Sequence, residues 1–333
     1  MPASSRPAEP STSAASAGSG SRAAEAPAGV AGSEPGHRGY PEHLREEVER
    51  YLATLRFSRE QLTHGLEEAM RYSLLAGGKR IRPVLALATA RSLGMEQREV
   101  LPLAGAIELI HTYSLIHDDL PAMDDDELRR GQPTCHVKFG EDVAILAGDG
   151  LYAEAFRHLL TAQRSAPERV LAAAAELAAA TGVNGMVGGQ YADVSAGAAS
   201  TPAALRRLHE LKTGRLIGAS VLCVLLLSGV HSAAETAPFR TFAAEVGVLF
   251  QIVDDILDVT GTDDALGKPR GSDERHGKRT YVSEFGVARA RELAAESHGA
   301  ALAALAEVAA RARAADATVE LEGITDFIYT RTS

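Results

Sequence analysis

A run of acidic residues directly follows one of the most apolar stretches of the chain. Residues 101–116 are apolar enough to form a buried helix, and residues 118–127 then read DDLPAMDDDE. An acidic run is usually a solvated surface, but unpaired carboxylates at the end of a buried helix are costly. Pro121 lacks an N–H and its ring clashes with the carbonyl four residues earlier, so we expect the helix to break there. This break predicts that Asp124 turns back toward Asp118.

A second acidic cluster lies inside another apolar segment, FQIVDDILD, at residues 250–258. Asp254 and Asp258 are four residues apart, which places both carboxylates on one face of a helix, about 6 Å apart. Like charges at that spacing repel each other, and a cation between them relieves the repulsion. Oxygen ligands without His or Cys favour Mg2+ over zinc or iron. Two such clusters on separate apolar helices therefore predict a magnesium site.

Basic residues accompany both acidic segments, and they suit an anionic ligand. The planar fork of Arg makes bidentate contacts with phosphate, whereas Lys offers a mobile point charge. Each basic residue taken alone is more often a solvated surface group. Together with two carboxylate clusters, they predict a phosphorylated ligand held with the metal. The residues concerned are Lys79, Arg82, Arg129, Arg130, Lys212, Arg215, Lys268 and Lys278.

Composition and charge exclude several classes of function. The chain has 333 residues, 34 basic and 44 acidic side chains, and a formal net charge of −10. This balance argues against a nucleic-acid partner, which demands a basic face. Cys135 and Cys223 form no CxxC pair, so we expect no disulfide scaffold and a reducing, cytoplasmic location. The longest uncharged apolar segment, residues 216–230, is short for a membrane span, and we expect a core helix without integral membrane contact.

Helical periodicity begins after a tail of different composition. Ala, Ser, Gly and Pro occupy most of residues 1–39, which leaves too little apolar surface to offset the entropy of ordering, so this tail is predicted to be disordered. From residue 40 onward, apolar residues recur at the three- and four-residue spacing of a helix face. Sustained β-type alternation is hard to find, so residues 40–333 are predicted to form one all-α domain. After a first helix from Pro41, the expected helices are 66–75, 83–92, 101–120, 143–160, 167–181, 202–228, 238–258 and 287–315.

Six segments, in this order, resemble the trans-prenyl diphosphate synthase family. They are GGKRIRP, HTYSLIHDDLPAMDDDELRRGQPT, GGQYADV, LKTG, FQIVDDILD and GKPRGSDERHGKRTY. The four residues between Asp119 and Asp124 are similar to the bacterial farnesyl diphosphate synthase type rather than to the shorter DDxxD form. The resemblance covers about residue 40 to the C-terminus. It implies an isoprenoid-synthase helical bundle around a deep central cavity, and a homodimer.

The activity implied by the resemblance is a head-to-tail condensation of isopentenyl diphosphate with an allylic diphosphate. It would depend on Mg2+, with three ions per site, held by Asp118 and Asp124 from one wall and by Asp254 and Asp258 from the other. Family analogy gives the following roles. The catalytic residues would be Asp118, Asp124, Lys212 and Asp254. The allylic diphosphate would face Arg129, Lys212, Thr213, Gln251 and Lys268, and isopentenyl diphosphate would face Lys79, Arg82, His111 and Arg130. The family pattern extends less specifically to Lys278, Asp255 and Arg331.

Product length is expected to depend on Tyr113. This residue lies five positions before Asp118, about 7.5 Å along a helix axis. From the spacing alone, its ring is either a floor beneath the growing chain or an aromatic core residue. In the family an aromatic residue at this place resembles farnesyl-forming members. Tyr113, with its neighbour Ser114, is therefore expected to limit products mainly to C15, made from dimethylallyl and geranyl diphosphate, with geranyl or geranylgeranyl diphosphate synthesis as the alternative.

Other classes of protein fit these residues less well. A class I terpene cyclase usually carries Asn/Asp, Ser/Thr and Glu in its second motif, where this chain has three aspartates. A carboxylate-bridged di-iron bundle needs two ExxH units, and the chain has one, at Glu108 and His111. The glycines around Lys268 have the wrong spacing for a P-loop. A non-catalytic partner subunit is a further alternative, although no motif residue is visibly missing.

Overall fold

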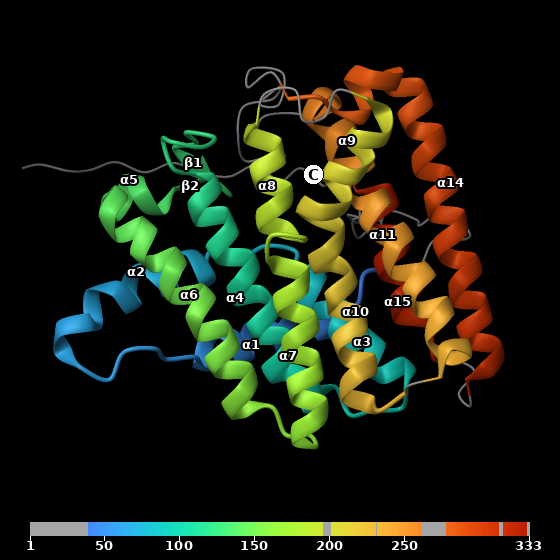
Figure 1. Ribbon diagram of the computed structural model, residues 1–333, viewed down its shortest axis with the longest axis horizontal. Coiled ribbons are helices and arrows are strands. Elements are labelled where there is room, and N and C mark those ends of the chain that lie inside the picture. Colours follow the sequence, from blue (N-terminus) through green and yellow to red (C-terminus); the bar gives the residue numbers. More distant parts are fainter. Residues whose placement is uncertain (1–38, 196–200, 231, 262–277, 313–315, 332–333) are drawn as a thin grey trace, which may run out of the picture. The chain divides into compact units, whose positions relative to one another are not determined.

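The computed structural model describes residues 39–195, 201–230, 232–261, 278–312 and 316–331. These residues all belong to one compact unit, His37–Ser333, and the expected disordered tail lies outside them apart from its last residue. The described chain is almost entirely helical, which confirms the all-α class (Figure 1). It also contains a hairpin of two very short strands, β1 (Leu128–Arg129) and β2 (Gln132–Pro133), which was not expected.

The described residues form α-helices and shorter helical turns. In chain order they are α1 (Glu42–Thr54), η1 (Gln61–Thr63), α2 (His64–Leu74), α3 (Ile81–Ser92), η2 (Gln97–Val100), α4 (Leu101–Asp118), α5 (Cys135–Phe139), α6 (Glu141–Ala162), α7 (Pro167–Thr181), α8 (Met186–Val194), α9 (Pro202–His209), η3 (Glu210–Gly214), α10 (Arg215–Ser228), α11 (Ala233–Thr260), α14 (Tyr281–Arg311) and α15 (Val319–Thr330). The short helices α5 and α8 and the last helix, α15, were not among the expected elements.

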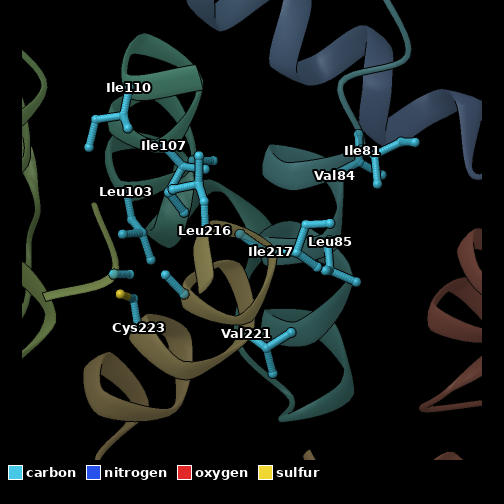
Figure 2. Close-up of a cluster of buried hydrophobic side chains, with 14 of the residues drawn as sticks. Ile81, Val84, Leu85, Leu103, Ile107, Ile110, Leu216, Ile217, Val221 and Cys223 are labelled. Atoms are coloured by element: carbon cyan, nitrogen blue, oxygen red, sulfur yellow. The ribbon is translucent and has the colours of Figure 1, made fainter. Parts of the chain in front are cut away.

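A central cluster of buried hydrophobic side chains lies where α3, α4 and α10 meet (Figure 2), and the core extends from it over the neighbouring helices. Leu103, Ile107 and Ile110 of α4 are fully buried and recur at the spacing of one helix face, so burial of this apolar stripe holds the helix in place. Around this centre, α4 also packs against α6, α10 against α7, and α11 along α14. The central position of α4 and α10 explains why both are apolar on most sides. It also places the C-terminal end of α4 inside the bundle.

Helix α11 begins five residues earlier than expected and includes Pro238. The hydroxyl of Ser232 accepts a hydrogen bond of 3.2 Å from the backbone N–H of Glu235, which caps this earlier start. Pro238 has no N–H to donate to the carbonyl of Ala234 four residues before it. Arg311 of α14 donates to that carbonyl instead, at 3.0 Å. A tertiary contact from α14 thus replaces the backbone hydrogen bond that Pro238 cannot make.

The single helix expected over residues 202–228 is interrupted at its centre. Glu210–Gly214 form a π-helical turn, η3, between α9 and α10. Such turns are rare, occur mostly as single turns inside α-helices, and are frequent at functional sites. A Cβ on Gly189 of α8 would lie 2.3 Å from the backbone nitrogen of Lys212, and one on Gly247 of α11 would lie 2.9 Å from the Cα of Gly214. Two glycines therefore let neighbouring helices approach the widened turn directly.

Three helical stretches are long and apolar enough to cross a membrane, judged by length and composition: Gln97–Asp118, Pro167–Val194 and Pro202–Ser228. Residues 216–230, considered above as a core helix, lie largely within the third. Within the described fold, 67%, 44% and 56% of their most apolar windows are buried, respectively.

Candidate active site

A cavity of about 990 Å³ lies at the C-terminal end of α4 and is bordered by residues of α3, α4, α6, α8, η3 and α11. Most residues expected to form the site line it. These are Lys79, Arg82, His111, Tyr113, Ser114, Asp118, Arg129, Arg130, Lys212, Thr213, Gln251 and Asp254, together with Arg331. Asp124 and Asp258 are not among the lining residues, and Lys268 lies outside the described residues.

The first acidic run folds back on the end of α4, as the proline predicted. Helix α4 ends at Asp118, and the backbone N–H of Asp124 donates a hydrogen bond of 2.9 Å to the carbonyl oxygen of Asp118. Burial, and then the negative charge of Asp124, raise the pKa of Asp118 to about 6. The ammonium group of Lys278 lies 2.8 Å from Oδ1 of Asp124. The run therefore combines a half-buried carboxylate that lines the cavity, Asp118, with a second one paired to a lysine, Asp124.

Asp119 has a different role from its neighbours, because it anchors Arg129. Its side chain is buried, with 3% exposure. Nε of Arg129 lies 2.8 and 2.9 Å from the two carboxylate oxygens, and Nη2 lies 2.5 Å from Oδ1. Arg129 belongs to β1, so the unexpected hairpin holds its guanidinium at the cavity. This bidentate contact fixes the orientation of Arg129.

Helix α11 carries the second group of carboxylates, of which Asp254 lines the cavity. The side chain of Asp254 is 58% exposed, and Nη2 of Arg331 lies 3.3 Å from its Oδ1. Asp255 is buried and accepts hydrogen bonds from the backbone N–H of Tyr281, at 2.6 Å, and from the side chain of Gln251, at 2.7 Å. Asp255 therefore fastens the start of α14 to α11. Asp258, one helical turn beyond Asp254, is also buried.

The π-helical turn η3 contributes Lys212 and Thr213 to the lining of the cavity. The ammonium of Lys212 lies 2.5 Å from Oδ2 of Asp193 on α8. The hydroxyl of Thr213 donates to Oε1 of Gln251 at 2.9 Å. Asp193 was not among the expected site residues, and its position inside the GGQYADV segment was its only signal in the sequence. Lys278 also approaches Asp193, at 3.8 Å, so this carboxylate lies between two lysines.

The third part of the cavity is basic. Nη1 of Arg82 lies 3.4 Å from Nε2 of His111. Burial lowers the pKa of Arg82 to about 10. Burial, and then the positive charge of Arg82, hold the pKa of His111 well below its usual range, so the imidazole is neutral near pH 7. Arg130 donates to the carbonyl oxygen of Gly77, and Lys79 lies over the ring of Phe327, 5.5 Å from its centroid.

The two aspartates that line the cavity, Asp118 and Asp254, offer oxygen donors for a metal ion. Among the described residues, no three His, Cys, Asp or Glu side chains converge closely enough to hold a metal ion by themselves. Asp118 and Asp254 nevertheless line one cavity from two helices, and Mg2+ is commonly bound by one or two carboxylates together with substrate phosphates and water. The residues present therefore fit Mg2+ that is shared with a phosphorylated ligand.

Tyr113 lines the cavity one and a half turns before Asp118. Its ring is 9% exposed and packs edge-on against Tyr152 of α6, with centroids 5.0 Å apart. Tyr152 in turn packs against Phe156, at 5.3 Å. The ring of Tyr113 therefore lines the cavity and is also part of an aromatic cluster.

Comparisons with known proteins agree with this geometry. The chain matches the polyprenyl synthetase family model over residues 63–316. It is 47% identical over 261 residues to farnesyl diphosphate synthase of Geobacillus stearothermophilus, covering 74% of this chain and 88% of that protein. It is 48% identical over 236 residues to the chloroplastic geranylgeranyl pyrophosphate synthase of Capsicum annuum, covering 70% of this chain and 64% of that protein.

A solved structure shows the same fold with ligands in place. It is a geranyltransferase from Helicobacter pylori complexed with magnesium and isoprenyl diphosphate, with a TM-score of 0.77 and 31% identity, covering 87% of this chain and 96% of that one. The family match extends over most of the chain and includes every residue that lines the cavity except Arg331. The chain therefore belongs to the polyprenyl synthetase family, a family of prenyltransferases.

Proposed function

We propose that this protein is a short-chain trans-polyprenyl diphosphate synthase. It joins isopentenyl diphosphate head to tail to dimethylallyl or geranyl diphosphate and gives mainly farnesyl diphosphate. The observation that carries this proposal is a cavity lined by Asp118 of α4 and Asp254 of α11, by basic residues, and by Tyr113 of an aromatic cluster.

Departure of the allylic diphosphate is the step that the charged walls would assist. Arg129, Lys212 and Thr213 would contact this diphosphate, and Lys268 is proposed to join them. Preorganised cations at the place where negative charge develops are often the largest contribution to catalysis. Mg2+, when bound by Asp118, Asp124, Asp254 and Asp258 and by the diphosphate, supplies further positive charge to the leaving group. Three ions per site is the number that we propose.

Isopentenyl diphosphate would occupy the basic part of the cavity. Lys79, Arg82, His111 and Arg130 are the residues proposed to hold its diphosphate. Departure of diphosphate would leave an allylic carbocation, which the double bond of isopentenyl diphosphate would attack, and the released diphosphate would accept the proton that is lost. No side-chain base is then required. The apolar side chains that line part of the cavity would shield this carbocation from water, and the altered backbone of η3 supports a role for its carbonyl dipoles near that charge.

Product length is proposed to be set at Tyr113 and Ser114. Farnesyl and geranylgeranyl synthases resemble this chain about equally, so overall similarity does not favour either product. The ring of Tyr113 supports C15, because it would obstruct a longer chain that runs along α4 from the carboxylates. Geranyl and geranylgeranyl diphosphate synthesis are the alternatives within the family.

Assembly and location complete the proposal. We propose a cytoplasmic homodimer without integral membrane contact. Exposed apolar side chains on α6, such as Leu146 at 54% and Leu160 at 49%, support a surface that is covered by a second copy. Light scattering of the purified chain tests the dimer, and cell fractionation tests the location.

One experiment tests the activity and the product together. The full chain is incubated with Mg2+, isopentenyl diphosphate and, separately, the C5, C10 and C15 allylic primers, and the products are separated by chromatography. We expect C15 product from the C5 and C10 primers and no turnover with a chelator. A folded chain that makes no product with any primer would contradict the proposal and favour a non-catalytic subunit.

A further inference from the structure

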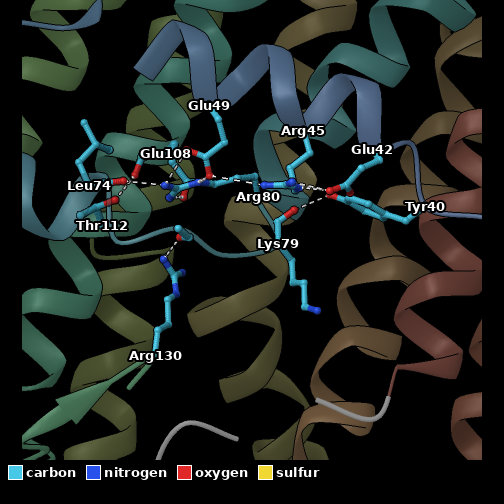
Figure 3. Close-up of polar contacts among 11 residues, drawn as sticks. Tyr40, Glu42, Arg45, Glu49, Leu74, Lys79, Arg80, Glu108, Thr112 and Arg130 are labelled. Carbon is cyan, nitrogen blue, oxygen red and sulfur yellow. Dashed lines mark hydrogen bonds and ion pairs between the residues drawn. The ribbon is translucent and has the colours of Figure 1, made fainter. Parts of the chain in front are cut away.

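Arg80 is buried at the turn that leads into α3, between two basic residues of the cavity. Its side chain makes three sets of contacts (Figure 3). Nε lies 2.8 Å from Oε1 of Glu49 on α1, Nη1 lies 2.6 Å from Oε1 of Glu108 on α4, and Nη2 donates to the carbonyl of Leu74 at 2.7 Å. Because all three nitrogens are engaged in this way, Arg80 is poorly placed to bind a substrate itself.

The backbone of Arg80 has an unusual conformation. Its φ of 53° and ψ of 35° place it in the left-handed region, which is unfavourable for a residue with a Cβ and persists only where the surroundings impose it. The turn is fixed on both sides, because the hydroxyl of Tyr40 donates to the carbonyl of Lys79 at 2.6 Å and Arg130 donates to that of Gly77. In Figure 3 the side chain of Lys79 points away from Glu49, on the side from which Arg130 approaches.

Glu108 is the buried anion of this cluster. Its side chain is 1% exposed, lies at the cavity wall, and has no hydrogen-bond partner for Oε2 among the described residues. Burial lowers the pKa of Arg82 and of Arg130, and the charge of Glu108 opposes that effect for both. Glu108 thus contacts Arg80 directly and influences two cavity arginines through the electric field.

We propose that the buried Arg80–Glu108 ion pair is a positioning element for the isopentenyl diphosphate half of the site. The pair imposes the left-handed turn, and this turn directs Lys79 and Arg82 into the cavity. Arg80 and Glu108 are positioning residues that act through these two cations. The inference rests on the proposed function. It deepens that function by naming residues that position the site for isopentenyl diphosphate but not the site for the allylic diphosphate.

A purely structural role makes a different prediction. A buried ion pair is in itself weak evidence for stability, because desolvation of the two charges offsets their attraction. If the pair only stabilised the fold, its loss would lower the melting temperature and affect both substrates alike. If it positions Lys79 and Arg82, its loss raises KM for isopentenyl diphosphate selectively.

Glu108→Gln and Glu49→Gln form a matched pair for the test. Both remove one carboxylate from Arg80, but the side chain of Glu49 is 27% exposed on α1 and does not line the cavity. For Glu108→Gln we expect KM for isopentenyl diphosphate to rise about tenfold, with KM for geranyl diphosphate within about twofold of the parent. For Glu49→Gln we expect both KM values to stay within about twofold. Calorimetric titration with isopentenyl diphosphate should reproduce the change as a weaker Kd.

A second pair of variants keeps the proposal testable if Glu108→Gln fails to fold. Arg80→Gln should raise KM for isopentenyl diphosphate, and Arg80→Lys, which keeps the charge, should restore part of the loss. If the parent is active and these variants change KM for both substrates equally, or change neither, the inference is overturned and the proposed function stands. A parent that folds and shows no turnover would instead contradict the proposed function. If the parent also fails to bind isopentenyl diphosphate in the titration, the inference fails with it.

Discussion

The backbone N–H of Asp124 donates to the carbonyl oxygen of Asp118 at 2.9 Å, so the acidic run closes on itself at the end of α4. This bond keeps two like charges in one neighbourhood, and Asp124 contributes, after burial, to the raised pKa of Asp118. A nearby cation stabilises the charged form of such a half-buried carboxylate, which relates the backbone turn to the proposed metal chemistry.

Replacing Asp118 by Asn should nearly abolish turnover while the helical content stays unchanged. The amide keeps the shape of the side chain but removes the charge expected to bind metal and diphosphate, and we expect kcat to fall about a hundredfold or more. Asp125→Asn is the matched control, because Asp125 belongs to the same run but is exposed and does not line the cavity. Steady-state kinetics and circular dichroism measure both effects. Unchanged turnover in the Asp118 variant would remove this residue from the mechanism.

Replacing Tyr113 by Ala should lengthen the products to C20 or beyond. The change removes a ring that lines the cavity and packs on Tyr152, and it opens space along α4. Tyr113→Phe keeps the ring and should still give C15. Chromatography of products from the C10 primer checks both variants. If the alanine variant still stops at C15, another residue terminates the chain.

Replacing Gly189 by Ala should reduce both stability and activity. The new Cβ would lie 2.3 Å from the nitrogen and 2.5 Å from the Cα of Lys212, so the backbone of η3 would have to move. Gly218→Ala on α10 is the control, because a Cβ there meets nothing within 4 Å. That variant should gain about 0.5–1 kcal/mol from the higher helix propensity of Ala. Urea unfolding measures both changes, and equal effects of the two substitutions would contradict this account of the turn.

His209 should make the free energy of unfolding depend on pH. Burial lowers its pKa to about 4 from an ordinary value near 6.5, so the folded state takes up this proton less readily than the unfolded state. The contribution of His209 to the free energy of unfolding is complete above about pH 6.5. It decreases by about 2 to 3 kcal/mol as the pH falls to about 4.5. Compared with the parent, His209→Gln should therefore become relatively more stable in acid. Urea unfolding at several pH values measures this difference, and parallel curves for the two proteins would contradict the assignment.

The sequence determined the fold class and the chemical character of the site because both depend on local patterns. The helical period of the apolar residues predicted an all-α chain, and Pro121 predicted that the first acidic run turns back. The spacing of Asp254 and Asp258 predicted carboxylates on one helix. Each of these signals acts within one or two helical turns, where backbone geometry alone decides which side chains are neighbours.

Only the tertiary structure decided how the charged residues are paired. Lys278 contacts Asp124 from 154 residues away, and Arg80 contacts Glu108 from 28 residues away. The start of α11 before Pro238 and the π-helical turn at Lys212 likewise depend on contacts with Arg311, Gly189 and Gly247. A buried charge takes its partner from whichever helix packs against it. That choice follows from the arrangement of the whole bundle and has no periodic trace along the chain.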